Sequence, residues 1–343
     1  MIEKNKLINP TKANFVGDLI RQLAAAVPGP SGHPPSTSTS SSTSTTTTNN
    51  NITSHPPQPP RGVDRDALLA QIQHDAVTGA NLEDLDEYVE GLYEDRLEDR
   101  IRYSAMISTL FRHPSNLPTL LDHPALFGAL ARVLRDDWKK SIDLEIYIIS
   151  AFFAVSLWSN LHSRLVENLV GKITVDIIEL ELRRASERTE SEGIAPSAIA
   201  NRVSEQQRGG GASAPRMSER ERRWLGVIQK QDRLLYYCFY LLLNLAEDVN
   251  LERKMRRHNI VGLLMECLDR SNVDLLLVVT MFLKKLSIFE ENKDAMARGG
   301  IIEKLARFVP VGNAELLAIT LRLLHNLSFD ANLRSEMVCE SGG

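Results

Sequence analysis

The chain has 343 residues, of which 43% are hydrophobic and only 6% aromatic, and its formal net charge at pH 7 is −4. A leucine-rich, aromatic-poor composition favours stacked helices over a sheet, and the small net charge excludes general attraction to nucleic acid or anionic lipid. The three cysteines, 29 and 72 residues apart, match neither a disulfide framework nor a metal motif, and no uncharged stretch of eighteen residues predicts membrane insertion.

The N-terminal part of the chain is predicted to contain little fold of its own. Residues 1–27 carry one possible amphipathic helix, and a single helix cannot build a core. Residues 28–63 consist mainly of Ser, Thr, Pro and Asn, including the run SSTSTTTT. Such a segment cannot bury enough apolar surface to offset its backbone entropy, so we expect a disordered linker.

Helical patterning begins after residue 64 with an acidic segment, LEDLDEYVEGLYEDRLEDRI, at residues 82–101. Leu85, Tyr88, Val89 and Leu92 have helical spacing and predict a buried stripe. The many carboxylates indicate a solvated face, although an acidic contact surface for a basic partner is an open alternative.

Three kinds of helix then follow one another in a fixed order. Residues 100–113 predict a long helix, 115–123 a short one and 125–137 a medium one, and 141–159 predict the next long helix, which should be buried. Residues 160–169 repeat the short pattern. The next spacing is irregular, and a polar, Gly-rich insertion at residues 185–221 accounts for the excess length.

The C-terminal hundred residues repeat with a constant period. Leu245, Leu286 and Leu327 are each 41 residues apart, as are the methionines ten residues further on, Met255, Met296 and Met337. A period of about forty with helical patterning predicts an all-α, armadillo-type right-handed α-solenoid spanning residues 64–343, with its last repeat truncated. Asn250, Asn292 and Asn332 are interpreted as capping residues of the short helices, and Gly299-Gly300 as the break before a medium helix.

Nothing in the sequence predicts catalysis. No nucleophile elbow, phosphate-binding loop or HExxH motif is present, and the eight histidines are scattered through linkers and helix ends. We therefore expect no enzymatic activity, no catalytic residues, no metal and no cofactor.

One face of the long helices carries the candidate binding residues. Asn244, Lys285 and Asn326 occupy equivalent positions in successive repeats, and we call them the ladder residues. Spacing of three to four residues places further side chains on the same face: Arg233, Tyr236, Tyr240, Met281 and Arg322. Repeated Asn amides can clamp an extended peptide backbone in a groove, whereas Lys285 would favour a carboxylate. The alternative, that the asparagines only satisfy neighbouring turns, remains open.

A second candidate contact is the basic cluster of Lys254, Arg256 and Arg257 on a predicted short helix. Four charges without interleaved aromatic residues, counting His258, do not predict nucleic-acid binding. A solvated edge is the default interpretation, and a salt-sensitive protein contact is the alternative.

Several segments resemble the kinesin-associated protein family, the non-motor accessory subunit of heterotrimeric kinesin. They include DLDEYVEGLYED, ALARVLRDDWKKS, YLLLNLAEDVNLERKM, FLKKLSIFEENKDAM and ITLRLLHNLSFDANLRSEMV. The resemblance covers most of residues 82–337 and implies an adaptor that binds the tails of two motor subunits and links them to cargo proteins. It also implies a cytoplasmic, microtubule- and cilium-associated protein, of which this sequence is a fragment. A small-GTPase regulator or a transport receptor on the same fold is the alternative.

Overall fold

The structure is a computed structural model that describes residues 76–77, 79–193 and 218–339. The chain divides into two units, Met1–Arg65 and Asp66–Gly343, and all of the described residues belong to the second. The expectations for residues 1–27 and 28–63 therefore concern parts of the chain outside the described residues. Helices are the only regular elements in the described ranges, in agreement with the predicted all-α fold.

The helices lie where the predicted long, short and medium elements were expected, and we keep these names, but the predicted lengths are wrong in part. The acidic segment forms η1 (Leu82–Asp84) and α3 (Leu85–Gly91) and runs into the first long helix. The long helices are α4 (Leu97–Phe111), α7 (Ile142–Ser156), α11 (Glu219–Leu245), α14 (Val273–Leu286) and α17 (Ala314–Leu327). The short elements are η2 (Pro114–Asn116) with α5 (Leu117–Asp122), η3 (Ser159–Leu161) with α8 (His162–Glu167), α12 (Val249–Arg257), α15 (Glu290–Arg298) and α18 (Ala331–Cys339). The medium helices are α6 (Leu126–Asp137), α9 (Val170–Glu192), α13 (Ile260–Cys267) and α16 (Ile301–Ala306). Helix α9 has 23 residues, while α13 with eight and α16 with six are shorter than the short helices α12 and α15 with nine each.

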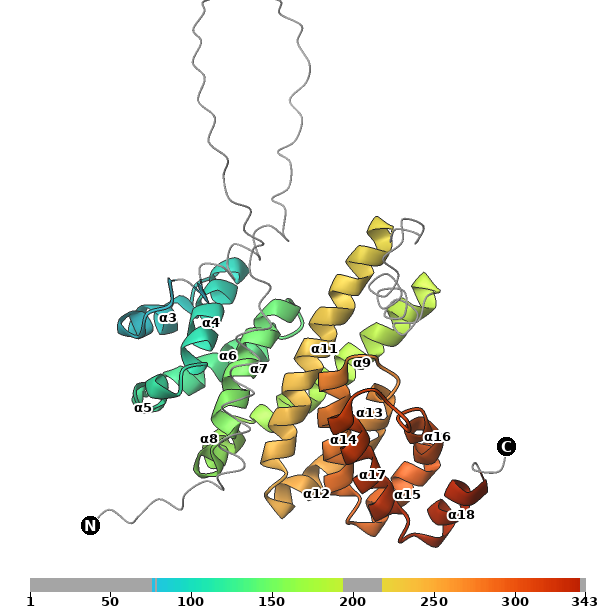
Figure 1. Cartoon of the computed structure of the whole chain (residues 1–343). Coiled ribbons are helices and arrows are strands. Elements are labelled where there is room, and N and C mark those ends of the chain that lie inside the picture. Colours follow the sequence, from blue (N-terminus) through green and yellow to red (C-terminus); the bar gives the residue numbers. More distant parts are fainter. Residues whose placement is uncertain (1–75, 78, 194–217, 340–343) are drawn as a thin grey trace, which may run out of the picture. The chain divides into compact units, whose positions relative to one another are not determined.

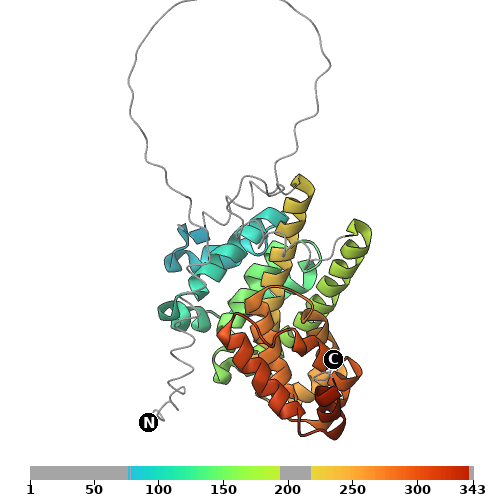
Figure 2. The same cartoon turned by 45° about the vertical axis from the view of Figure 1, so that its right-hand side comes forward.

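Consecutive long helices pack against one another and form a single layer. Helix α7 packs between α4 and α11, and α14 packs between α11 and α17 (Figure 1). Medium helices lie on one side of this layer, where α9 packs against α11 and α13 packs against α14 and α15 (Figures 1 and 2). The repeat unit is thus three helices whose long member contacts the long members before and after it.

Four of the five long helices begin at polar residues whose side chains satisfy first-turn backbone N–H groups, and α4, which begins after Arg96, has no such cap. The side chains of Ser141, Ser218, Asn272 and Asn313 accept hydrogen bonds from the N–H groups of the first turn of α7, α11, α14 and α17. Ser218 also forms a reciprocal capping box with Glu221.

The predicted caps of the short helices are wrong. Asp248 and Asp330, which precede the predicted asparagines by two residues, accept from the first-turn N–H groups of α12 and α18. Asn292 is fully buried inside α15, and its Nδ2 donates backward to the carbonyl of Leu286 at 3.1 Å. Asn292 therefore fastens the turn after a long helix instead of opening a short one, whereas Asn250 and Asn332 are exposed and contribute their backbone N–H groups to the aspartate caps.

The turn from a short to a medium helix uses a left-handed backbone conformation in three repeats. Leu169, Asn259 and Gly300 immediately precede α9, α13 and α16 and have φ values of 57°, 54° and 68°. The predicted break at Gly299-Gly300 is confirmed, because Gly299 caps the end of α15 and Gly300 turns the chain. Glycine adopts this conformation without steric cost, whereas leucine adopts it only at a steric cost.

The core lies where the leucine stripes of the long helices meet. Leu245, Leu286 and Leu327 are at most 1% exposed, which confirms the inward direction predicted for this column. Leu85, Tyr88, Val89 and Leu92 are also buried, as their spacing predicted. Most of α7 is buried, as expected for residues 141–159.

Among the described residues, no single helix is long and apolar enough to cross a membrane. Helix α7 and the segment Ser159–Glu167 meet the length and composition criteria only when taken together, and they are bent by 117° relative to each other.

The predicted insertion overlaps the helices on both sides. Residues 185–192 extend α9, where Ala185 is buried, and residues 219–221 form the first turn of α11. Trp224 and Ile228, further along α11, are buried with Leu225 and Val227 packed beside them. Residues 194–217 are outside the described part of the chain.

Candidate binding face

The ladder residues occupy the last turn of three successive long helices, and each is half-buried. Nδ2 of Asn244 in α11 donates to Oγ of Ser156 in α7 at 3.0 Å. Nδ2 of Asn326 in α17 donates to Oγ of Ser287, which caps α14, at 3.0 Å. Each amide therefore bonds to the end of the preceding long helix.

Lys285 makes the corresponding contact between α14 and α11. Its Nζ donates to the backbone carbonyl of Leu243 at 3.3 Å. The carbonyls in the last turn of a helix lack intrahelical partners and carry partial negative charge, so they attract an ammonium group or an amide donor. Asn and Lys thus perform the same structural task in different repeats, which explains how the column accommodates both.

These contacts bear on the two interpretations of the ladder. Nδ2 of Asn244 donates one hydrogen bond and Nδ2 of Asn326 donates two to the preceding long helix, so satisfying neighbouring helices is one role of this column. A partner could still meet the amide oxygens, since the Oδ1 atoms of Asn244 and Asn326 accept no hydrogen bond from another described residue. Peptide binding by the ladder residues remains a prediction.

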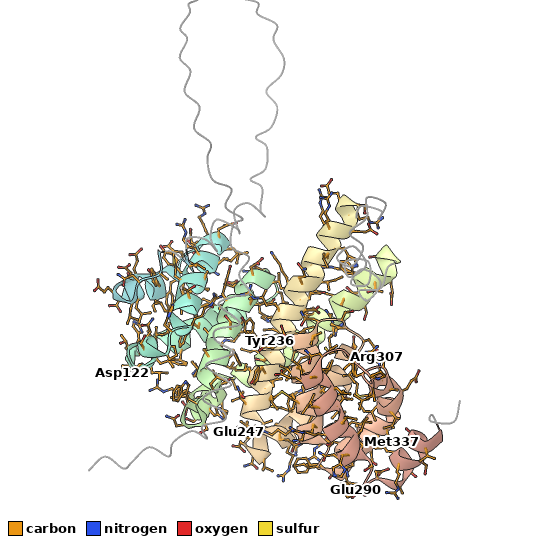
Figure 3. All side chains as sticks on the ribbon, in the orientation of Figure 1. Asp122, Tyr236, Glu247, Glu290, Arg307 and Met337 are labelled. Carbon is orange, nitrogen blue, oxygen red and sulfur yellow. The ribbon has the colours of Figure 1, made fainter. Side chains whose placement is uncertain are left out.

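The tyrosines of the same face are much more buried than the ladder residues. Tyr236 is 9% and Tyr240 6% exposed, and their rings meet edge to face with centroids 5.9 Å apart. Tyr240 also packs against Phe153 of α7 at 5.0 Å. Burial raises the pKa of Tyr236 and raises that of Tyr240 to about 12, so both hydroxyls are protonated donors at neutral pH. Tyr236 lies near the middle of α11 (Figure 3).

The remaining residues predicted on this face differ in accessibility. Arg322 is exposed on α17, and Met281 is half-buried on α14. The structure thus brings the ladder residues into bonding contact with neighbouring helices, seats the tyrosines in the packed interior of the face, and leaves Arg322 in solvent.

The basic cluster is not uniform. Arg256 is held by Glu291, with Nη1 and Oε2 3.0 Å apart, and its guanidinium lies 5.9 Å from the ring centroid of Phe289. Lys254 and Arg257 are exposed on α12. The ion pair to the next repeat assigns Arg256 a structural contact, and the other two cations remain the accessible part of the cluster.

Sequence reasoning missed two side chains near the α11 face, because they come from other helices at unrelated spacings. Arg112 caps the C-terminus of α4 and is half-buried, and Tyr147 of α7 is 8% exposed. Burial lowers the pKa of the Arg112 guanidinium, and the charge of Arg233 lowers it further. Only the tertiary structure places Arg112 in the electrostatic range of Arg233.

The described residues contain no group of three or more His, Cys, Asp or Glu side chains able to hold a metal ion. Cys238 and Cys267 are buried free thiols, and burial raises the pKa of each.

Three-helix units joined through one layer of long helices define an armadillo-type helical repeat protein. The model of one protein family, described as kinesin-associated protein (KAP), matches residues 1–342. The chain therefore belongs to the kinesin-associated protein family.

Solved armadillo structures are similar to this chain at low identity. The designed armadillo repeat protein YIII(Dq)4CqI is 12% identical, with a TM-score of 0.49, over 78% of this chain and 96% of that chain. Computationally designed armadillo repeat proteins for modular peptide recognition match with 13% identity and a TM-score of 0.49, over 77% and 94% of the two chains. A designed armadillo repeat protein in complex with the peptide (KR)4 matches with 12% identity and a TM-score of 0.47, over 76% and 92%.

Proposed function

We propose that this chain is a non-enzymatic adaptor of a heterotrimeric kinesin. It binds the tails of the two motor subunits and links them to cargo proteins for microtubule-based transport, including transport in cilia. Membership of the kinesin-associated protein family supports the motor partner. In this role the protein is located in the cytoplasm and associates with microtubules and cilia.

The observation that carries the proposal is the layer of long helices with one polar column. Ladder residues from α11, α14 and α17 reach the same face at the same helical level, because each bonds to the helix before it. Equivalent side chains on packed helices recur at roughly 8–10 Å, the interaxial distance. A motor tail in an extended conformation can therefore meet one repeat after another along this face.

The accessible cations of the basic cluster, Lys254 and Arg257, provide a second contact in this proposal. Both lie in the last turn of α12, where positive charge is favoured by the helix dipole. An acidic part of a partner attracted to them would bind less tightly at high salt, because exposed charges are screened.

The test measures binding of the full chain to the coiled-coil and tail segments of a heterodimeric kinesin by calorimetry. The test variant carries Asn244→Ala and Asn326→Ala. Because these amides also join repeats, a matched control carries Asn272→Ala and Asn313→Ala, which remove asparagines from the opposite ends of α14 and α17. Loss of one hydrogen bond or cap costs about 1 kcal/mol of stability in either case, so the two variants should unfold at similar denaturant concentrations.

Tail binding that weakens in the Asn244 and Asn326 variant alone supports motor contact at the ladder residues. Equal binding by both variants would move the motor to another face and leave the adaptor role standing. No binding by the unmodified chain would contradict motor binding by this chain.

A further inference from the structure

Exposed apolar side chains recur at the turns that join long helices to the short elements after them. Ile288 and Phe329 occupy equivalent positions in successive repeats, 41 residues apart, and are 68% and 70% exposed. Trp158 lies in the corresponding turn after α7, and Val249 is the first residue of α12; they are 37% and 56% exposed. We call these four side chains the apolar row, and no role described above uses them.

The ladder residues hold the turns of the apolar row side by side, because each bonds to the end of the preceding long helix at 3.0 to 3.3 Å. Two of the acceptors are next to the row. Ser287 immediately precedes Ile288, and Ser156 lies two residues before Trp158. The short elements that follow these turns lie along the lower edge of the layer in Figure 1. Neighbouring turns therefore recur at about the interaxial distance of packed helices, roughly 8–10 Å.

Packing within the chain does not explain the exposure of these side chains. The ring of Phe329 meets the imidazole of His325 edge to face, with centroids 5.2 Å apart, and most of its surface still faces water. Single exposed apolar residues are ordinary, whereas a row of them at the ends of four successive long helices, bordered by polar groups, is typical of a protein-binding surface.

Carboxylates border the apolar row. Asp248 directly precedes Val249, and Glu290 follows Ile288 by two residues. Both carboxylates are exposed, and within the described ranges neither forms an ion pair. They attract positive charge in a partner, because complementary charges favour association across an interface.

The cations near the row do not cancel this field. Arg256 is paired with Glu291, with Nη1 and Oε2 3.0 Å apart, and Nη1 of Arg334 donates to a backbone carbonyl at 2.8 Å. The exposed cations Lys254 and Arg257 lie in the last turn of α12, at the opposite end from the row. A basic partner segment therefore fits the row better than an acidic one.

The spacing of the row distinguishes between a helical and an extended partner. In an α-helix, residues seven positions apart share one face and are about 10.5 Å apart along the axis. In an extended strand, side chains on one face are about 6.6 or 13 Å apart, since successive residues point to opposite faces. A helix with an apolar residue at every seventh position therefore matches the row, and a strand does not.

We propose that the apolar row binds an amphipathic helix of a protein partner, which carries an apolar side chain at every seventh position and basic residues beside it. The apolar side chains of this helix cover Ile288 and Phe329, and its Lys or Arg side chains pair with Asp248 and Glu290. The proposal rests on the adaptor role above, and it names the kind of segment by which the partner is held.

The test measures binding of the full chain to two fluorescent synthetic helices by anisotropy and to kinesin motor tails by calorimetry. The first helix carries leucine at every seventh position and lysine on both sides of each leucine. The second has the same composition with leucine at every fifth position, so its leucines do not share one face.

The row variant carries Ile288→Ser and Phe329→Ser. The matched control carries Leu321→Ser and Val338→Ser, which remove apolar side chains that are 48% and 70% exposed elsewhere on α17 and α18. Because all four side chains are exposed, thermal unfolding should be nearly the same in both variants. A third variant, Glu290→Gln, removes one carboxylate from the border of the row.

The row variant should bind the first helix and the motor tails roughly 10- to 100-fold more weakly, since apolar contacts are lost, while the control binds as the unmodified chain does. Glu290→Gln should weaken binding by roughly two- to fivefold and reduce its dependence on salt. The second helix should bind the unmodified chain more weakly than the first helix does.

The outcomes separate this inference from the proposed function. Helix and tail binding that are equal in the row variant and the unmodified chain overturn the inference and leave the adaptor role standing. Row-dependent binding of the first helix, without tail binding by the unmodified chain, contradicts the motor partner and supports the row. Binding of neither by the unmodified chain overturns both.

The controls test the details of the proposal. An equal loss in the control variant would overturn the assignment of the contact to the row. Equal binding of the two synthetic helices would overturn the seven-residue spacing. Row-dependent binding to phosphatidylcholine vesicles, in place of the first helix, would overturn the choice of a protein partner.

Discussion

The side-chain amide of Asn326 donates a hydrogen bond to the hydroxyl oxygen of Ser287 at 3.0 Å, across 39 residues of sequence. The hydroxyl of Ser287 in turn donates to the carbonyl of Lys284 at 2.7 Å, so the two bonds form a short relay from α17 into α14. Ser287 is fully buried, which keeps water from replacing either bond. Adjacent repeats are thus fastened by polar contacts as well as by leucine packing.

Ser287→Ala should lower the free energy of unfolding by about 1 kcal/mol, because the Asn326 amide loses one of its two acceptors. Combined with Asn326→Ala, the change should be less than additive by roughly 0.5–1.5 kcal/mol. Urea denaturation of the two single variants and the double variant measures this coupling. Strict additivity would show that the bond contributes nothing.

The ion pair between Arg270 and Asp232 joins the segment after α13 to α11, with Nη1 and Oδ1 2.6 Å apart. Both side chains are less than a tenth exposed, and burial raises the pKa of Asp232 despite the opposing charge of Arg270. Arg270→Met should cost roughly 3–5 kcal/mol, since it leaves a buried carboxylate unpaired. Replacing Asp232 by Leu in the same chain should recover most of that loss.

The comparison for this ion pair is the exposed pair of Arg307 with Asp269, at 3.3 Å. Arg307→Met should cost about 1 kcal/mol or less, because solvent screens the charges. Chemical denaturation of both Met variants distinguishes the two environments, and equal losses would contradict the buried character assigned to Arg270.

Glu145 of α7 is fully buried and neither of its carboxylate oxygens has a hydrogen-bond partner in the described structure. Burial, together with the Glu181 carboxylate, raises its pKa from 4.5 to about 9. The folded state therefore keeps this proton where the unfolded chain loses it. The stabilising contribution is complete below pH 4.5, declines by about 1.4 kcal/mol per pH unit as the pH rises, and is lost at about pH 9.

Glu145→Gln should remove this dependence while keeping the shape of the side chain. Urea unfolding of both proteins from pH 5 to 9 isolates the contribution of this group, because all other titrations are shared. The two curves should diverge with rising pH, with the variant increasingly more stable. Parallel curves would mean that Glu145 is ionised or solvated in the folded state.

Leu327→Ala should destabilise the chain by roughly 2–5 kcal/mol, because Leu327 is completely buried between repeats. Leu321 lies on the same helix and is 48% exposed, so Leu321→Ala provides a matched control with a loss of about 0.5 kcal/mol. Thermal unfolding of both variants is the measurement. An unmoved transition for Leu327→Ala would disprove the inward orientation of the leucine column.

Substitutions at two of the left-handed turns should change the stability of the chain in opposite directions. A Cβ at Gly300 meets nothing closer than 4.0 Å, so Gly300→Ala should cost about 1–2 kcal/mol through its φ of 68° alone. Leu169 has nearly the same conformation and is 54% exposed, and Leu169→Gly should therefore stabilise the chain by roughly 0.5–1 kcal/mol. Destabilisation by Leu169→Gly would indicate that its side chain contributes packing which outweighs the strain.

The helix order and the inward leucines were predictable because they depend on local periodicity. The pattern that places Leu286 and Leu327 in one column is repeated at constant spacing, and burial follows from it. The caps of the short helices were not predictable. Asn292 reaches backward to the previous helix, and no local sequence pattern distinguishes this contact from a forward cap. Backbone geometry had to be known first.

The binding face was predictable only in part. The sequence identified Asn244, but its partner Ser156 lies 88 residues away across an irregular spacing, so the inter-repeat bond was not foreseen. Arg112 and Arg233 come from different helices with no common period, and no sequence signal pairs them. Contacts of this kind arise from packing, which periodicity does not specify.

The left-handed residue before α9, α13 and α16 has an evolutionary consequence. Because φ near 60° at one residue turns the chain, the direction in which each of these medium helices leaves the short helix is set by a residue of its own repeat. A repeat that contains the residue for its own turn can be duplicated, lost or interrupted at a loop while the repeats on either side keep their geometry. The chain can therefore change length by whole repeats, with the corner residue free to vary among Leu, Asn and Gly as long as the backbone turn is kept.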